Sequence, residues 1–400
     1  MPIVAFEVTA VDEVVIGKAK ERTRFSFEYL DWRPFALAGL NVLSILLVWA
    51  PFLGDMRTIC RYLDGPMYMY VAATLYSIPA DSPLHAMPLP DFYYACHLVV
   101  FPLLIRAFSF LGYDWSMLFV SAAASTLATV IFYYLVKEFK YSVNPFWASI
   151  VFIFFPCRWL LYHSVGATEP VFILLVVASL YCYKKDSYVL AFLLAGLASA
   201  TRIFGILLFV SYAVTLISQR KYRYLPLTLL IPAFLVANFL NYQVIYGDFF
   251  AYFKYNGSFV SIAHIALPYL SWSVPVPVPL PMFLTNVLPG NTNNMELFIA
   301  IYVLYILGTL RLWKHKELFF YSAFFVGAIM FIGHPDISRY LLPAAPFALI
   351  LAFDDIISRK EFMLVFPLII VLGYLYCWGL VPSNLMDAGI YGDMINSINR

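Results

Sequence analysis

A carboxylate in an aromatic-rich stretch is the residue of this sequence best suited to acid–base chemistry. Asp64 lies in the stretch 61–68, RYLDGPMY, shortly after a hydrophobic segment that ends near Leu53. Only 12% of the residues are charged. A charged side chain costs about 2.5 kcal/mol or more at a bilayer centre, and less toward the interface. A carboxylate kept beside such a segment predicts a functional role, although capping the following helix and pairing with Arg61 are two structural alternatives.

Further polar residues outside the basic clusters occur in four later segments. They are His163 and Glu169, Arg202, Asp248, and the group His334, Arg339 and Tyr340. Aspartate or glutamate can accept a proton from a hydroxyl, and arginine binds phosphate through planar, permanently charged donors. The combination suits a transfer in which a hydroxyl loses its proton while a lipid phosphate leaves.

Structural roles remain open for several of these residues. Glu169 could cap the helix that follows it, and Arg339 could be an interface anchor whose charge reaches the polar layer. For His163, His334 and Asp248, a role in local structure is favoured over a role in chemistry. If they do take part, Arg61, Tyr68, His163, Asp248 and His334 are candidates for substrate binding.

The composition indicates an all-α, polytopic membrane protein. Hydrophobic residues make up 63% of the chain and aromatic residues 19%, and no polar block of domain size interrupts the apolar runs. The net charge of +2 argues against nucleic acid as a partner. The five cysteines show no CxxC spacing and the six histidines no metal-binding pattern. We therefore expect neither a metal nor another cofactor.

The basic residues predict the topology, because lysine and arginine concentrate in cytoplasmic loops. Most of them form six clusters, near 18–33, 137–140, 184–185, 220–223, 311–316 and 359–360. If all six are cytoplasmic, an even number of crossings separates neighbouring clusters. This rule leaves two crossings, 34–53 and 115–136, before the second cluster, so the apolar segment 92–111 is predicted to lie in the outer interface.

The same rule predicts about eleven transmembrane helices in one membrane domain over 34–381. The later ones are expected at 146–162, 168–183, 188–201, 204–218, 224–245, 295–310, 318–333, 340–354 and 362–381. Residues 1–33 form a cytoplasmic arm, 54–114 a first external loop with interfacial helices, 247–294 a second external loop, and 382–400 an external tail.

Arg202 interrupts the long apolar run 190–218. One helix over this run would rise about 43 Å, which exceeds the roughly 30 Å hydrocarbon core and would leave Arg202 at mid-membrane. A hairpin that turns near Arg202 is favoured. The alternative is a single tilted helix with Arg202 in a buried ion pair.

Five segments resemble, in the same order, a known family. They are 63–76 (LDGPMYMYVAATLY), 155–156 with 167–172 (FP and ATEPVF), 194–202 (LAGLASATR), 246–248 (YGD) and 338–343 (SRYLLP). Together they resemble the GT-C glycosyltransferases, and among them the GPI mannosyltransferase 2 (PIG-V-like) family. Leu63 replaces that family's tryptophan before Asp-Gly, and Leu75 replaces a later glycine.

The resemblance implies a GT-C-like fold and an inverting glycosyltransferase that takes a sugar, mannose by this likeness, from a polyprenyl (dolichyl) phosphate without a metal. Asp64 would be the general base, as inversion requires a base on the face opposite the leaving group. Glu169 would orient hydroxyls or share the proton. Arg202 and Arg339, with Tyr340, would bind the donor phosphate.

The expected partners are the polyprenyl-phosphate donor, a lipid or glycan acceptor, membrane lipids and, as an option, a small membrane subunit. The multi-pass protein is expected in a prokaryotic plasma membrane, or in the endoplasmic reticulum if eukaryotic, with a cytoplasmic N-terminus. Two other functions stay open: a transporter or flippase of lipid-linked sugars, and a non-catalytic membrane subunit. A transporter should have polar residues within its spans and internal repeats, whereas the predicted spans contain almost no charge apart from Arg158.

Overall fold

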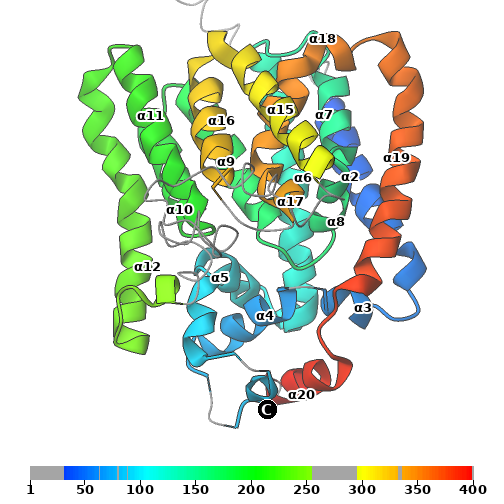
Figure 1. The fold of residues 1–400 in the computed structure, drawn as a ribbon, viewed down its shortest axis with the longest axis vertical. Coiled ribbons are helices and arrows are strands. Elements are labelled where there is room, and N and C mark those ends of the chain that lie inside the picture. Colours follow the sequence, from blue (N-terminus) through cyan, green and yellow to red (C-terminus); the bar gives the residue numbers. More distant parts are fainter. Residues whose placement is uncertain are drawn as a thin grey trace, which may run out of the picture.

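The computed structural model describes residues 31–62, 64–78, 81–87, 89–254, 295–331 and 336–398. All regular elements in these ranges are helices, and a single antiparallel bridge joins Tyr62 to Leu385. Long helices form a bundle, and a layer of short helices lies across one end of it, the lower end in Figure 1. The predicted all-α class is confirmed.

The helices of the bundle follow one another along most of the chain. Their bounds are α2 Arg33–Trp49, α6 Tyr113–Glu138, α7 Pro145–Phe154, α8 Cys157–Tyr162, α9 Glu169–Lys184, α10 Tyr188–Ser199, α11 Leu207–Ser218, α12 Leu230–Tyr246, α15 Met295–Arg311, α16 Lys316–Ile329, α17 Ile337–Tyr340, α18 Asp354–Ile357 and α19 Lys360–Leu380. The layer at the lower end contains α3 Arg57–Cys60, α4 Gly65–Thr74, α5 Val100–Ala107 and, from the C-terminus, α20 Ala388–Ile398.

Short 3₁₀ turns, labelled η, connect many of these helices. They are η3 Ala50–Phe52, η4 Pro83–Ala86, η5 Asp91–Cys96, η6 Ser109–Leu111, η7 Ile203–Ile206, η8 Tyr222–Leu229, η10 Leu312–Lys314, η11 Leu342–Ala344, η13 Leu351–Phe353 and η14 Val381–Ser383, while η12 Pro346–Ile350 is π-helical. Local sequence explains several boundaries. Asn144 caps α7 by accepting from the Trp147 N–H at 3.1 Å, with Pro145 at the first helical position.

Four helical stretches in the described residues are long and apolar enough to cross a membrane: Arg33–Phe52, Tyr113–Glu138, Tyr222–Tyr246 and Lys360–Ser383. The bent pair Ile337–Ala344 and Pro346–Ile357, with 77° between its halves, would make a fifth. The exposed face of α19 has Leu364, Leu368 and Leu372 at helical spacing, 54% to 82% exposed, as expected where lipid covers a helix. These features are those of an all-α membrane protein.

The remaining predicted crossings correspond to shorter helices. The segment 146–162 is divided between α7 and α8 at Pro156, because the residue before a proline disfavours helical geometry. α10 has 12 residues and α9 has 16, whereas a straight crossing needs about 20. The segment 92–111 contains α5 with only 8 residues. That length agrees with an interfacial helix and not with a crossing.

The basic clusters that the structure describes, from 137–140 onward, lie together at the end of the bundle opposite the short-helix layer. Ion pairs link them from one cluster to the next: Lys137 with Asp31, Lys185 with Glu138, Lys184 with Glu317, Lys221 with Asp186, and Arg311 with Asp355. The exposed pairs among them contribute about 0 to 1 kcal/mol each, whereas Glu317 in its pair with Lys184 is buried. These ion pairs nevertheless show that loops far apart in sequence lie at the same end of the bundle.

The hairpin at Arg202 is confirmed. After α11 the chain returns to the start of α10, where the Lys221 Nζ donates to the Tyr188 hydroxyl at 2.6 Å and to Asp186 at 3.1 Å. At the turn, Arg202 has an extended backbone, with φ −143° and ψ 135°. A Cβ on Gly205 would meet the Ser199 backbone nitrogen at 2.4 Å. The turn therefore needs glycine at this close approach, and it leaves Arg202 at a helix end.

Candidate functional site

Two arginines share one buried carboxylate between the bundle and the short-helix layer. Glu169 is the first residue of α9 and is completely buried. Its Oε1 accepts from the Arg202 Nη1 at 2.6 Å and from the Arg339 Nε at 2.5 Å. The second oxygen, Oε2, is buried without a hydrogen-bond partner. Because a buried charge is strongly penalised unless it is paired, the Glu169 carboxylate depends on these two arginines, and the three side chains form one triad.

Separate elements bring the two guanidinium groups to Glu169. Arg202 reaches it from the α10–η7 turn and also donates to the Thr168 Oγ1 at 3.0 Å. Arg339 lies in the four-residue helix α17, and its guanidinium carbon lies 4.6 Å from the centre of the Tyr162 ring. The Arg202 guanidinium carbon is 5.8 Å from the centre of the Tyr340 ring. Cation–π contacts of this kind add about 0.5 to 2 kcal/mol each and fix the planes of the guanidinium groups.

Asp64 lies beside this triad with a more accessible side chain. It immediately precedes α4, but its side chain makes no capping hydrogen bond. Its Oδ2 is 3.5 Å from the Arg339 Nη1, and the side chain is 39% exposed. Arg61, the other proposed partner, donates instead to the Met386 carbonyl at 3.1 Å. Neither structural alternative for Asp64 is observed, and among the described residues its carboxylate makes one long ion pair.

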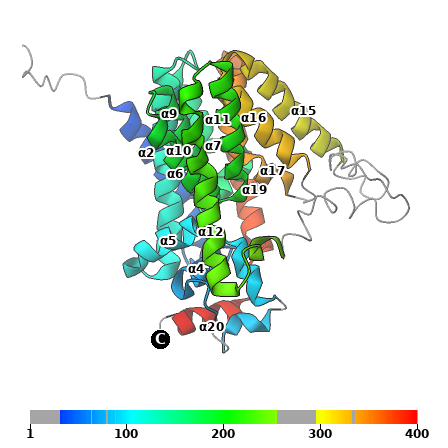
Figure 2. The same ribbon diagram turned by 90° about the vertical axis from the view of Figure 1, so that its left-hand side faces the viewer.

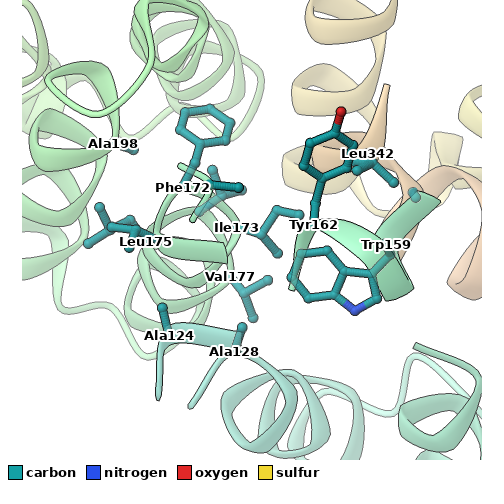
Figure 3. Packing of buried hydrophobic residues seen from close by; sticks show 14 of the residues in the cluster. Ala124, Ala128, Trp159, Tyr162, Phe172, Ile173, Leu175, Val177, Ala198 and Leu342 are labelled. Atoms are coloured by element: carbon teal, nitrogen blue, oxygen red, sulfur yellow. The ribbon is translucent and has the colours of Figure 1, made fainter. Parts of the chain in front are cut away.

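A second ion pair supports the arginine side of the site. Arg158 of α8 pairs with Asp336, which directly precedes α17, and the Tyr162 hydroxyl donates to the Asp336 Oδ2 at 3.2 Å. Tyr162 therefore lies between the two arginine groups, and Figure 3 shows it on α8 next to Leu342 and the α9 residue Ile173. The sequence indicates Arg158 because it is a charged residue within a predicted transmembrane span. The sequence does not predict that Asp336 is its partner.

The remaining candidates are placed differently. Tyr68 is buried in α4, within electrostatic range of Asp64 and Arg202. His163 is completely buried, and its Nε2 lies 3.4 Å from the Ser44 Oγ in the α2–α8 packing. Asp248 forms an ion pair with Lys254 at 2.6 Å in the segment after α12. His334 lies outside the described residues. The structure thus brings Asp64, Tyr68, Glu169, Arg202, Arg339 and Tyr340 together, but not His163 or Asp248.

The arrangement combines a proton acceptor with an anion-binding surface. Each arginine has five N–H donors, of which the contacts above use only some. Glu169 holds both cations in place, while Asp64 remains partly open to approach. In the described part of the chain, no three His, Cys, Asp or Glu side chains form a group that could hold a metal ion.

No family model matches the chain, and the searches of curated proteins and of solved structures likewise return no significant match. The function must therefore be inferred from the arrangement of these side chains.

His97 provides a prediction for the pH dependence of stability in the short-helix layer. It is 2% exposed and packs edge-on against Tyr68, with 4.5 Å between the ring centres. Burial lowers the pKa of His97 to about 4 from an ordinary value of 6.5. The unfolded chain therefore binds more protons between these two pH values, so stability is retained above pH 6.5 and lost as the pH falls toward 4. The full effect is about 3 kcal/mol.

Thermal unfolding of the detergent-solubilised protein between pH 7.5 and 4.5 measures this effect. His97→Gln should flatten the decline relative to the wild type, because glutamine does not titrate. His85→Gln is the matched control at an exposed histidine and should leave the decline unchanged. Equal pH profiles for His97→Gln and the wild type would contradict the assignment.

Proposed function

We propose that the protein is a membrane glycosyltransferase that moves a sugar from a polyprenyl phosphate to a lipid or glycan hydroxyl with inversion. One observation carries the proposal: a partly exposed carboxylate, Asp64, lies 3.5 Å from an arginine that is locked with a second arginine on buried Glu169. A base and a phosphate-binding surface thus adjoin at one end of the bundle. The likeness to the GPI mannosyltransferase 2 family, and hence mannose as the sugar and a GT-C-like fold, belongs to the same proposal.

The proposed reaction has one concerted displacement. Asp64 accepts the proton of the acceptor hydroxyl, whose oxygen attacks C1 of the donor sugar from the face opposite the phosphate. The bond between C1 and the phosphate oxygen breaks, and the polyprenyl phosphate leaves with the electron pair. Arg339 and Arg202 stabilise the negative charge that develops on it. The donor phosphate replaces Asp64 at Arg339, and the carboxylate becomes free to act as base.

The proposed topology places this site outside the cytoplasm. The end of the bundle with the basic clusters would face the cytoplasm by the positive-inside rule, so that Asp64, the α4–α5 layer and the C-terminal tail lie on the external or lumenal side. About eleven crossings belong to this topology, in which the shorter helices also cross the bilayer.

A transporter of lipid-linked sugars is the second candidate, and the bent pair at 337–357 favours it. Discontinuous helices of this kind often form substrate sites in transporters, near the bilayer midplane. Here only Arg339 lies within the bent pair, and the other charged groups of the site lie at the ends of other helices: Asp64 precedes α4, Glu169 begins α9, and Arg202 follows α10. This distribution supports the transferase proposal more than the transporter.

One experiment separates the two functions. Purified protein is incubated in detergent with radiolabelled polyprenyl-phosphate mannose and a glycolipid acceptor mixture, and label in the acceptor is measured with its anomeric configuration. In parallel, the protein in liposomes is tested for movement of the labelled lipid between leaflets. Transfer with inverted configuration is expected. Leaflet exchange without transfer would overturn the proposal in favour of the transporter.

Tyr162 gives a prediction for donor affinity. Tyr162→Leu removes the ring next to the Arg339 guanidinium, and a desolvated cation–π contact is worth about 2 kcal/mol, or about 30-fold in affinity. We expect the KM for the donor to rise by this order, measured in the transfer assay. Tyr162→Phe keeps the ring and should have the smaller effect. If both variants are equally impaired, the hydroxyl contact with Asp336 matters more than the ring.

A further inference from the structure

The C-terminal segment is joined to the chain directly before Asp64. The Met386 N–H donates to the Arg61 carbonyl at 2.9 Å, and the Arg61 Nη1 donates to the Met386 carbonyl at 3.1 Å. Beside these contacts, Tyr62 and Leu385 form the antiparallel bridge. Residues 384–398, here called the C-terminal strap, therefore hold the backbone two residues from the proposed base.

The strap continues as a helix across the external layer. α20 contacts α4 and η4, and Figure 2 shows it beneath α4 at the end away from the long helices. Tyr391 and Met394 are its buried anchors, and the Asp387 Oδ1 accepts from the N–H groups of Gly389 and Ile390 at its start. The strap thus packs on the layer that contains Asp64.

The backbone around Asp64 depends on such contacts. α3 has 4 residues and α4 has 10, and isolated helices of this length are unstable. In the part of the chain that the structure describes, the side chain of Asp64 adds one ion pair of 3.5 Å. The strap connects this segment to α19, whose Tyr376 ring centre lies 5.7 Å from the guanidinium carbon of Arg158. Through Arg158 and Asp336, α19 also borders the element that contains Arg339.

We propose that the C-terminal strap positions Asp64 opposite Arg339, an inference that rests on the proposed glycosyl transfer. In this role Arg61 is a positioning residue and not a substrate ligand. Loosening the strap displaces the base but leaves Glu169, Arg202 and Arg339 in place on the bundle. Because a misplacement of about 1 Å can lower a rate about 100-fold, the effect falls on kcat. The KM for the donor is unchanged.

The first test uses point variants of the full-length chain. Arg61→Ala should lower kcat by about 10- to 100-fold at an unchanged donor KM. Arg61→Lys should retain most of the activity, because its ammonium can donate to the same carbonyl. Arg57→Ala is the matched control, an exposed arginine one helical turn earlier, and should behave as the wild type. Wild-type kcat for Arg61→Ala would overturn the inference.

The second test restores the strap covalently. The backbone hydrogen bond from Met386 to Arg61 flanks the Tyr62–Leu385 bridge by one residue. Tyr62 and Leu385 are therefore a non-hydrogen-bonded pair of the antiparallel bridge, the kind of pair whose side chains lie closest. Tyr62→Cys with Leu385→Cys should form a disulfide on mild oxidation, and in the Arg61→Ala chain this should restore kcat. Reduction should remove the gain.

The outcomes of these tests are distinguishable. A raised acceptor KM for Arg61→Ala without rescue by the disulfide would make Arg61 a substrate ligand and overturn the inference. A wild-type protein without transfer activity would instead contradict the proposed function. In that case disulfide formation, measured by the shift on non-reducing gels, still tests the inference, and its absence would overturn it.

Discussion

Replacing Asp64 by asparagine is expected to lower glycosyl transfer by about 100- to 10,000-fold, the range lost when a general base is removed. Asparagine keeps the size of the side chain and can still accept a hydrogen bond, but it cannot take up the proton of the acceptor hydroxyl. Asp64 makes one 3.5 Å ion pair and no helix cap, so the substitution should leave folding intact. The measurement is the initial rate of sugar transfer from radiolabelled polyprenyl-phosphate mannose.

The control for this variant is Asp55→Asn. Asp55 is an exposed carboxylate of the same short-helix layer, and its Oδ2 accepts a hydrogen bond from the Thr58 hydroxyl at 3.0 Å. The Asp55→Asn variant should transfer the sugar at the wild-type rate. Both variants should also elute as the wild type in size-exclusion chromatography. If Asp64→Asn folds and transfers normally, the assignment of Asp64 as the base is wrong.

Replacing Glu169 by alanine is expected to have the largest effect on stability. The change leaves the guanidinium groups of Arg202 and Arg339 buried without their shared partner, and breaking a buried ion pair costs about 3 to 5 kcal/mol. The free energy of unfolding, measured by denaturant titration in detergent micelles, should fall by this amount. Transfer activity should be lost with it, because both arginines proposed to bind the donor phosphate lose their fixed positions.

Two further variants sharpen this prediction. Glu138→Ala removes a carboxylate that pairs with Lys185 and is 31% exposed, and a surface pair of this kind should cost about 1 kcal/mol or less. Glu169→Gln keeps an oxygen that can accept hydrogen bonds and should be less destabilising than alanine. If Glu169→Gln is as stable as the wild type but as inactive as Asp64→Asn, Glu169 takes part in the proton transfer and does not merely hold the arginines.

The sequence alone determined the class of the protein, an all-α membrane protein, and the grouping of its basic loops at one end. Apolar runs predict membrane helices because the hydrophobicity of a segment depends on its own residues and not on the segments that pack against it. The basic clusters likewise predicted a common end, which the ion pairs among Asp31, Lys137, Lys184, Lys185 and Lys221 now place together. The turn at Arg202 followed from the length of a helix compared with the bilayer.

Only the tertiary structure decided which charges meet. Glu169 binds arginines 33 and 170 residues away in sequence, Arg158 meets Asp336, and Met386 joins Arg61 across 325 residues. Hydrophobic periodicity specifies the buried face of a helix but not the helix against which it packs. Which partner an ionised group finds depends on that packing, since a buried charge persists only where packing brings its counter-charge. For this reason Asp64, Glu169, Arg202 and Arg339 could be named from the sequence, while the pairing of both arginines with Glu169 and the contact of Arg61 with Met386 could not.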